Sequence, residues 1–300
     1  MPALLRKLAT RPIWWWEKKR PYPIRSRCAR LPPIPVTPRG PLLAVLTTVP
    51  AFLDALWAAW SWHRFLHEQF QLAIFVDGET SERHRRASQQ LFPGVRIHEM
   101  SRITEEMCIS HPRLAAFITA HPLGRKIALL LHLQKARPVL FTDHDVLVFN
   151  APAEISEPGI QTPLHIQEEE GEGVFDGEML ARAAALGASH APALNSGVLY
   201  IPRGALCLET AEALLSDWKP PMRSWFTEQT VLSVLMRRAG SKPLARERYV
   251  VSNRRQFYSE KDVSYAAIAA RHFTAPVRHV MYLKGMPYLL RHPSITGGLQ

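Results

Sequence analysis

The sequence contains few cysteines and no cysteine pair. Cys28, Cys108 and Cys207 are the three among 300 residues, and no C-x-x-C spacing occurs. This scarcity excludes a disulfide framework and argues against a zinc site built from paired cysteines. A reducing compartment, the cytoplasm, is therefore expected. The N-terminus also lacks the apolar stretch of about 7 to 15 residues that a secretory signal requires.

Long apolar runs are missing as well. The most apolar segment, residues 41–62, contains Asp54 and is interrupted by Thr47-Thr48-Val49-Pro50. We interpret it as a strand, a turn and a helix, and not as a membrane span. The chain shows no internal repeat and no clear linker after residue 41, so we expect one domain over residues 41–300.

Acidic residues are almost absent from residues 1–40, which hold ten Lys or Arg and one acid, Glu17. This segment carries +9 of the net charge of +11, so a nucleic-acid-binding surface spread over the fold is not expected. The same residues contain eight prolines and the run Trp14-Trp15-Trp16. They predict a basic N-terminal arm. Aromatic rings beside cations suit peripheral contact with the inner face of a membrane, and packing of the tryptophans against the domain is the alternative.

From residue 41 the sequence alternates between strand and helix patterns. We expect strands at 42–46, 72–76, 95–98, 138–142 and 197–201, and helices at 52–60, 81–91, 125–136, 206–218 and 228–238, with a less regular stretch from 99 to 124. Such alternation predicts an α/β fold with a parallel sheet and helices on both faces. Ligands of these folds bind beyond the carboxyl ends of the strands, where Asp77 and Asp143 stand.

Two carboxylates interrupt an apolar run at residues 139–149, V-L-F-T-D-H-D-V-L-V-F. Charge inside such a run is costly unless a cation compensates it. The oxygen ligands of Asp143 and Asp145 suit Mg²⁺ or Mn²⁺, and a diphosphate can complete the coordination. The alternative is that the two aspartates only end a strand and begin a turn. For His144, between them, a role as a turn residue is favoured over a role as a ligand.

The surrounding segment, residues 125–150, resembles the glycogenin-like glycosyltransferases of the GT-A fold, in which a Lys-bearing helix precedes the strand that ends in D-x-D. Four further segments match that family in its order: L-T-T-V-P-A-F at 46–52, N-S-G-V-L-Y at 195–200, E-Q-T-V-L at 228–232 and R-H-F-T-A-P at 271–276. The resemblance spans about residues 41–285. It implies a Rossmann-like, mixed and mostly parallel sheet.

The resemblance also implies an activity: transfer of a sugar from a nucleotide-diphosphate donor to an acceptor, with retained configuration. Mn²⁺ or Mg²⁺ would bridge the protein and the diphosphate. Its protein ligands would be Asp143, Asp145 and His272, with Asp143 also near the ribose. The acceptor is open, and the basic arm suggests a lipid or an envelope glycan. The acidic run Glu168–Glu172 would help to build the acceptor side, or is a solvated loop.

The remaining roles are assigned from the same motifs. Lys126 would lie near the diphosphate, and Glu228 and Gln229 would face the reacting sugar carbon. The other substrate-binding candidates are Leu46, Thr48 and Phe52 for the nucleotide, Asn195, Ser196 and Gly197 for the sugar, Asp77 and His144 beside them, and Arg278, His279 or Lys284 for the diphosphate. Ordinary packing explains several of these nearly as well.

The sequence departs from the family pattern at two places. Val49 and Pro50 stand where an Asn and an Asp are usual, so the base is not predicted. Ala275 and Pro276 follow the histidine motif, where the family continues to a glycine and Lys-Pro-Trp. Two other functions stay open: a nucleotidyltransferase acting on a sugar phosphate, which usually has a Gly-rich basic loop after its first strand, and a non-catalytic nucleotide-sugar-binding or membrane-adapter protein.

Overall fold

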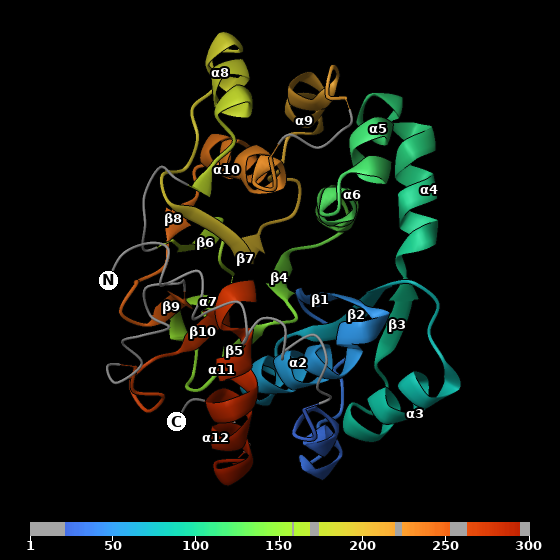
Figure 1. The fold of residues 1–300 in the computed structure, drawn as a ribbon, viewed down its shortest axis with the longest axis vertical. Helices are drawn as coiled ribbons and strands as arrows, with labels where there is room; N and C mark the ends of the chain where they lie inside the picture. Colours follow the sequence, from blue (N-terminus) through green and yellow to red (C-terminus); the bar gives the residue numbers. More distant parts are fainter. Residues whose placement is uncertain (1–21, 158, 169–173, 220–223, 253–262, 295–300) are drawn as a thin grey trace, which may run out of the picture.

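The computed structural model describes residues 22–157, 159–168, 174–219, 224–252 and 263–294. Its main sheet has seven strands in the order β3 (Arg96–Glu99), β2 (Gln71–Asp77), β1 (Leu42–Thr48), β4 (Val139–Asp143), β7 (Leu194–Ile201), β6 (Leu164–Gln167) and β8 (Lys242–Pro243), as Figure 1 shows. The first four strands run parallel to one another, and β7 is antiparallel to both of its neighbours. The predicted mixed, mostly parallel sheet is confirmed.

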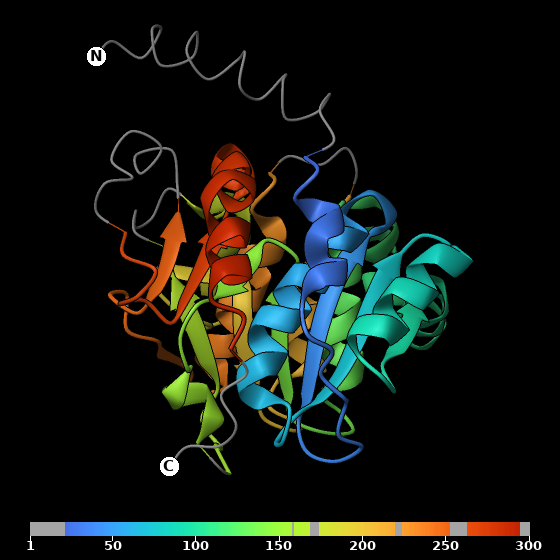
Figure 2. The ribbon, with the colours of Figure 1, turned by 90° about the horizontal axis from the view of Figure 1, so that it is seen from below.

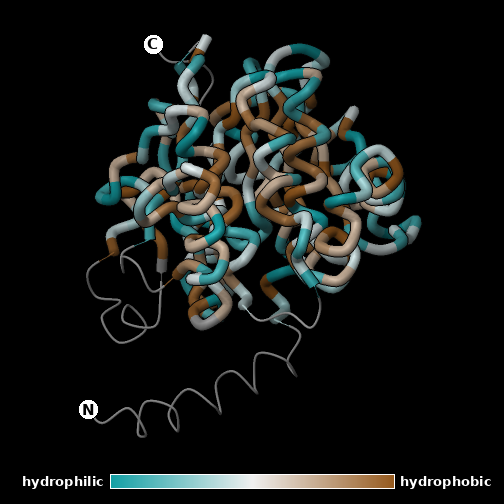
Figure 3. The backbone as a smooth tube through the Cα atoms, turned by 90° about the horizontal axis from the view of Figure 1, so that it is seen from above, coloured by the Kyte–Doolittle hydropathy of each residue, from teal (hydrophilic) through white to brown (hydrophobic). Residues whose placement is uncertain are grey.

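Helices cover both faces of this sheet because its strands are apolar on both sides. Side chains of β1 alternate between two cores, with Leu43 and Val45 in one and Leu42 and Ala44 in the other. The first core is covered by α2 (Phe52–Leu66), and α3 (Glu82–Leu91) packs beside α2. The second is covered by α4 (Met100–Ser110), α5 (Pro112–Ala120), α6 (Gly124–Leu133), α8 (Gly177–Ala185), α9 (Leu208–Leu215) and α10 (Thr227–Arg238). Figure 3 shows hydrophobic segments through the interior and hydrophilic ones toward the outside.

A second sheet of three strands follows β4. Its order is β5 (Val146–Val148), β10 (Ala270–Phe273) and β9 (Tyr249–Ser252), with β10 antiparallel to β5 and parallel to β9. The chain then continues through η5 (Ala275–Val277), α11 (Arg278–Val280), η6 (Met281–Gly285) and α12 (Met286–Arg291); the short helix α7 (Ala153–Ser156) follows β5. This second sheet joins the C-terminal part of the chain to the end of β4.

The predicted elements are present, with bounds that differ by a few residues. One interpretation is wrong: the stretch from 99 to 124 contains two helices, α4 and α5. The buried residues of α4, Met100, Ile103 and Met107, do follow a helical spacing. Residues 41–62 form β1, the 3-10 turn η2 (Val49–Ala51) and most of α2, as their interruption predicts. Across the described ranges, no helix combines the length and apolar character that crossing a bilayer requires.

Part of the predicted arm packs against the domain. The 3-10 helix η1 (Arg25–Arg30) lies along α2 in Figure 2. The indole nitrogens of Trp57 and Trp60 donate hydrogen bonds to the carbonyls of Arg25 and Pro32, both at 2.9 Å. Cys28, Leu31 and Ile34 are buried in the α2 core. The packed region therefore extends beyond the predicted boundary at residue 41 and includes described residues from Tyr22 onward. Trp14-Trp15-Trp16 lies outside the described residues.

Candidate active site

Three candidate metal ligands meet beyond the end of β4. Asp143 ends β4, Asp145 follows it before β5, and His272 belongs to β10 of the small sheet. One ligand atom from each lies within 4.8 Å of the other two. The two aspartates, separated by one residue, converge because the chain turns between β4 and β5. This is the arrangement that the D-x-D interpretation requires.

The small sheet brings His272 to Asp145. In the β5–β10 ladder His272 pairs with Val146, and the amide of Phe273 donates to the carbonyl of Asp145 at 2.8 Å. The His272 Nε2 atom therefore lies 3.2 Å from Asp145 Oδ1. Burial opposes protonation of His272, but the Asp145 carboxylate raises the pKa of the imidazole above its usual value. A metal ion at this point would replace the proton on Nε2.

The N-S-G segment at the start of β7 supports His272 from behind. Asn195 Oδ1 lies 2.9 Å from His272 Nδ1 and accepts the Gly197 amide at 2.8 Å. Asn195 Nδ2 donates to Glu168 Oε1 at 2.5 Å. A Cβ atom on Gly197 would lie 2.4 Å from His272 Nδ1, so only glycine fits there. Asn195 and Gly197 thus orient the imidazole, a contact that their predicted roles toward the sugar did not include.

Lys126 is a buried cation at the centre of the site. It stands in the first turn of α6, and its Nζ atom lies 3.1 Å from Asp143 Oδ2, 3.0 Å from Ser196 Oγ and 3.4 Å from Glu228 Oε1. Ser196 Oγ in turn donates to Glu228 Oε2 at 3.2 Å. Burial lowers the pKa of Lys126, but Asp143 and Glu228 outweigh it and raise that pKa. Burial raises the pKa of Glu228, and the Lys126 cation acts in the opposite direction by lowering that pKa.

Asp145 has its own cation. Arg278, at the start of α11, makes an ion pair with Asp145 Oδ2, while His272 faces Oδ1. Burial would raise the pKa of Asp145, yet Arg278 and His272 together hold it well below its usual range. Each aspartate of the D-x-D motif therefore has a Lys or Arg partner, Lys126 for Asp143 and Arg278 for Asp145, and Asp145 contacts His272 as well. The Arg278 contact was not foreseen, because no local pattern links residues 133 positions apart.

The donor set fits a divalent cation. It consists of two carboxylates and one imidazole, which suit Mn²⁺ or Mg²⁺. Arg278 and His272 favour the ionised form of Asp145 by lowering its pKa, and His272 presents one nitrogen to the ligand cluster while Asn195 holds the other. Such a partner behind a ligating histidine fixes its tautomer and its direction.

The residues predicted to bind the nucleotide differ from one another in exposure. Leu46 is half-buried and Thr48 exposed at the end of β1. Phe52 is 1% exposed, and its ring stacks on His84 with a centroid distance of 4.5 Å, so the structure does not open this ring to a base. Asp77, at the end of β2, makes an ion pair with Arg125, the residue before Lys126, and sequence reasoning missed this partner.

The other candidates lie near the cluster or on the C-terminal helices. Gln229 Oε1 accepts the Ser196 amide at 3.2 Å, and its Nε2 donates to Val174 O at 3.1 Å. Within the described part of the chain, the buried His144 Nε2 atom has no hydrogen-bond partner. His279 is buried in α11, and Lys284 is exposed in η6. Of the acidic run Glu168–Glu172, Glu168 is buried, and the rest lies outside the described residues.

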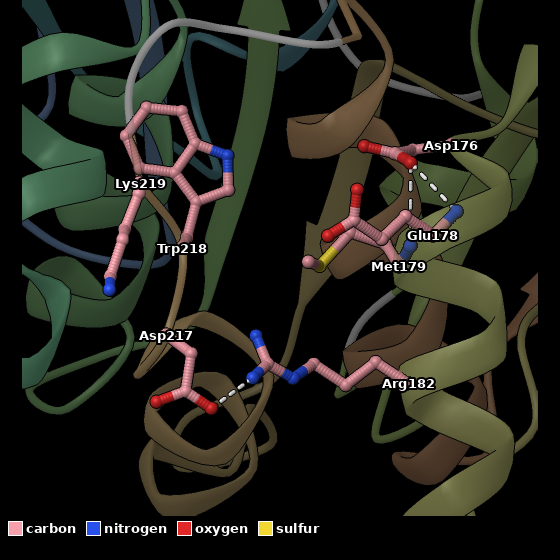
Figure 4. Close-up of a pocket in the computed structure, with 7 residues that line it drawn as sticks. All are labelled: Asp176, Glu178, Met179, Arg182, Asp217, Trp218 and Lys219. Atoms are coloured by element: carbon pink, nitrogen blue, oxygen red, sulfur yellow. Dashed lines mark hydrogen bonds and ion pairs between the residues drawn. The ribbon is translucent and has the colours of Figure 1, made fainter.

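A separate pocket lies between α8 and the end of α9, and Figure 4 shows its lining. Asp176 caps α8 by accepting the amides of Glu178 and Met179, at 3.0 and 3.3 Å, and it also accepts Thr227 Oγ1 at 2.6 Å. Arg182 makes an ion pair with Asp217 on the other side of the pocket. The Asp176 carboxylate and the Arg182–Asp217 pair are thus engaged within the protein. This pocket shares no residue with the metal-ligand cluster.

Comparisons with known proteins identify the fold. No family model and no curated protein matches the sequence. Mouse xyloside xylosyltransferase 1 aligns with a TM-score of 0.50 at 14% identity, over 80% of this chain and 99% of that one. The galactosyltransferase LgtC, solved with donor and acceptor sugar analogues, aligns with a TM-score of 0.51 at 17% identity, over 86% and 98%. The glycosyltransferase GlyE of Streptococcus pneumoniae TIGR4 aligns with a TM-score of 0.50 at 12% identity, over 85% and 63%. The chain therefore has the Rossmann-like GT-A fold of nucleotide-sugar glycosyltransferases.

Proposed function

We propose that this protein is a metal-dependent glycosyltransferase that moves a sugar from a nucleotide-diphosphate donor to a glycan or lipid acceptor. One observation carries the proposal: Asp143, Asp145 and His272 converge within 4.8 Å, beside the buried Lys126. Structures with the same fold include LgtC in complex with donor and acceptor sugar analogues. A fold alone does not establish a reaction, so the proposal depends on these side chains.

The basic residues of the site suit the leaving diphosphate. A divalent cation held by the two aspartates and His272 would supply positive charge where the bond to the sugar breaks. Arg278 is 31% exposed and has donors left after its contact with Asp145, so it can also reach a phosphate oxygen. Lys126 is 2% exposed and paired on two sides, so it acts mainly by fixing Asp143 and Glu228.

Glu228 and Gln229 border the place of the transferred sugar. Glu228 is buried against Lys126 and Ser196, which favours a role in stabilising charge over attack as a free nucleophile. Gln229 holds the Ser196 amide and thereby the start of β7. A protein nucleophile is not required if the anomeric configuration is retained, as the family resemblance implies. We propose that Asn195 positions His272. For Ser196 we retain the role of a substrate-binding residue that contacts the sugar.

A donor screen tests the function. Purified protein with Mn²⁺ is supplied with nucleotide-diphosphate sugars, and the released nucleoside diphosphate is measured. We expect release with one donor class and its loss in Asp145→Asn, with normal release in Asp217→Asn, a matched change at an exposed ion pair. Undiminished turnover in Asp145→Asn would contradict the metal assignment. Pyrophosphate release from a nucleoside triphosphate and a sugar phosphate would instead show a nucleotidyltransferase, and binding without turnover a non-catalytic protein.

A further inference from the structure

A chain of contacts connects the N-terminal segment to the metal-ligand cluster. Arg25 Nε donates to Asp54 Oδ1 at 2.6 Å, and Tyr282 OH donates to Asp54 Oδ2 at 2.9 Å. Tyr22 stacks on the Tyr282 ring with a centroid distance of 4.5 Å. Tyr282 stands one helical turn after Arg278, which pairs with Asp145. Residues from η1, α2 and the C-terminal helices thus meet behind the cluster.

The charges along this chain alternate, and most of them are buried. Asp54 is 2% exposed, and both of its oxygens are engaged, one by Arg25 and one by Tyr282. Burial raises the pKa of Asp54, and the Arg25 cation partly offsets this rise by lowering that pKa. Burial also raises the pKa of Tyr282, with Asp54 as the next cause, so the phenol stays a donor. Tyr282, which donates to Asp54, stands one helical turn after Arg278, so the Asp54 carboxylate lies on the Arg278 side of this chain of contacts. Its charge adds to the larger effect of Asp145 in raising the pKa of the Arg278 guanidinium. A free Asp54 oxygen would therefore compete with Asp145 for Arg278.

We propose that Arg25, Asp54 and Tyr282 are positioning residues of the active site. Arg25 and Tyr282 donate hydrogen bonds to both oxygens of Asp54. Both oxygens of Asp54 are therefore engaged, and Arg278 keeps its ion pair with Asp145. The inference rests on the proposed function, since it assumes that Asp145 binds a cation and that Arg278 serves the diphosphate. The segment from Tyr22 to Arg30, absent from the family resemblance, thereby becomes part of the catalytic unit.

Loss of the Tyr282 hydroxyl should move Arg278 toward Asp54. Asp145 then keeps one fewer cation, so Mn²⁺ alone binds more tightly, while an anion that needs Arg278 binds less tightly. Damage to the fold would weaken both ligands together. Opposite changes in the two affinities are therefore the signature of positioning. Loss of a partner behind a metal ligand commonly costs about 10- to 100-fold in metal affinity, and we expect both shifts here to have the size at the lower end of that range, about tenfold.

The test uses Tyr282→Phe, which changes no formal charge, in the full chain. Mn²⁺ affinity is measured by electron paramagnetic resonance, and pyrophosphate affinity by calorimetry with Mn²⁺ present. Asp54→Asn added to Tyr282→Phe should return both values toward wild type, because it removes the competing carboxylate. Tyr288→Phe, the same change on α12, is the matched control and should leave both affinities unaltered.

Two outcomes overturn the inference: both affinities of Tyr282→Phe equal to wild type, or both lowered together. If the wild type binds Mn²⁺ and loses it in Asp145→Asn, either outcome contradicts the inference alone. If the wild type binds neither Mn²⁺ nor pyrophosphate, the proposed function and the inference fail together. Arg25→Met, compared with Arg27→Met on the exposed side of η1, provides a second variant, and it should reproduce the opposite changes.

Discussion

The Nδ1 atom of His272 lies 2.9 Å from the Oδ1 atom of Asn195, a residue 77 positions earlier in the chain. The contact joins β10 of the small sheet to β7 of the main sheet. It holds the imidazole with Nε2 directed at Asp145. Much of the geometry of the proposed metal site therefore depends on a residue that does not ligate the metal.

Asn195→Ala should lower Mn²⁺ affinity by about 10- to 100-fold, because the imidazole loses the partner that fixes its tautomer and direction. The measurement is titration of free Mn²⁺ by electron paramagnetic resonance. Asn150→Ala is the control, since Asn150 donates to the carbonyls of Tyr265 and Ile268 and contacts no candidate ligand. Equal Mn²⁺ affinity in Asn195→Ala and wild type would reject the positioning role.

Gly197→Ala should abolish Mn²⁺ binding while the fold persists. The new methyl group would lie 2.4 Å from Nδ1 and 2.5 Å from Cε1 of His272, so the ring must move away from Asp145. Gly177→Ala is the matched control, because among the described residues nothing beyond its chain neighbours and its own helix backbone lies within 4 Å of the added Cβ there. Circular dichroism checks folding and calorimetry checks Mn²⁺. Normal Mn²⁺ binding in Gly197→Ala would show that the imidazole is not needed.

Lys126→Met should destabilise the protein by about 3–5 kcal/mol, because Glu228 is left as an unpaired charge in a buried site. The double variant Lys126→Met with Glu228→Gln should be destabilised less than Lys126→Met alone, since no unpaired charge remains at residue 228. Urea unfolding monitored by circular dichroism measures both. A double variant no more stable than the single one would mean that the two side chains do not compensate each other. Both variants should lose glycosyl transfer.

Acid should destabilise the protein through His63. Burial lowers the pKa of His63 to about 4, with Nε2 facing the carbonyl of Pro35 at 3.1 Å. The unfolded chain takes up this proton near pH 6.5 and the folded one only near pH 4. Stability should therefore fall as pH drops from 6.5 to 4, by about 3 kcal/mol for this residue. His63→Gln should remove that part of the dependence in urea unfolding at pH 7 and pH 4.5. If the stability of His63→Gln depended on pH as strongly as that of the wild type, the role of His63 in acid destabilisation would be contradicted.

Removal of residues 1–40 should destabilise the fold far more than removal of residues 1–21. The longer deletion uncovers the indoles of Trp57 and Trp60 and removes Cys28, Leu31 and Ile34 from the core. Each buried apolar side chain contributes about 1.5–3 kcal/mol. Thermal unfolding of the two shortened chains measures the difference. Equal melting temperatures would show that η1 adds nothing to the core.

Local patterns predicted much of the fold. Apolar periodicity placed the strands and most helices, because exposure alternates with the period of each element. The pair Asp143 and Asp145 was also predictable, since charge inside a buried run needs a compensating cation. Other features were missed for a physical reason. α4 and α5 bury few side chains each, so their helical apolar spacing is weak in the sequence. The Pro-rich segment 22–40 packs on α2 although its composition is typical of an arm.

The sequence by itself determined the elements, the two aspartates and the order of the motifs around them, because these depend on neighbours along the chain. Tertiary structure alone decided which side chains meet. His272 reaches Asp145 through the pairing of β5 with β10, strands of three and four residues whose register no local pattern specifies. Arg278 pairs with Asp145, and Phe52 turns its ring toward His84, because packing between distant elements sets those distances.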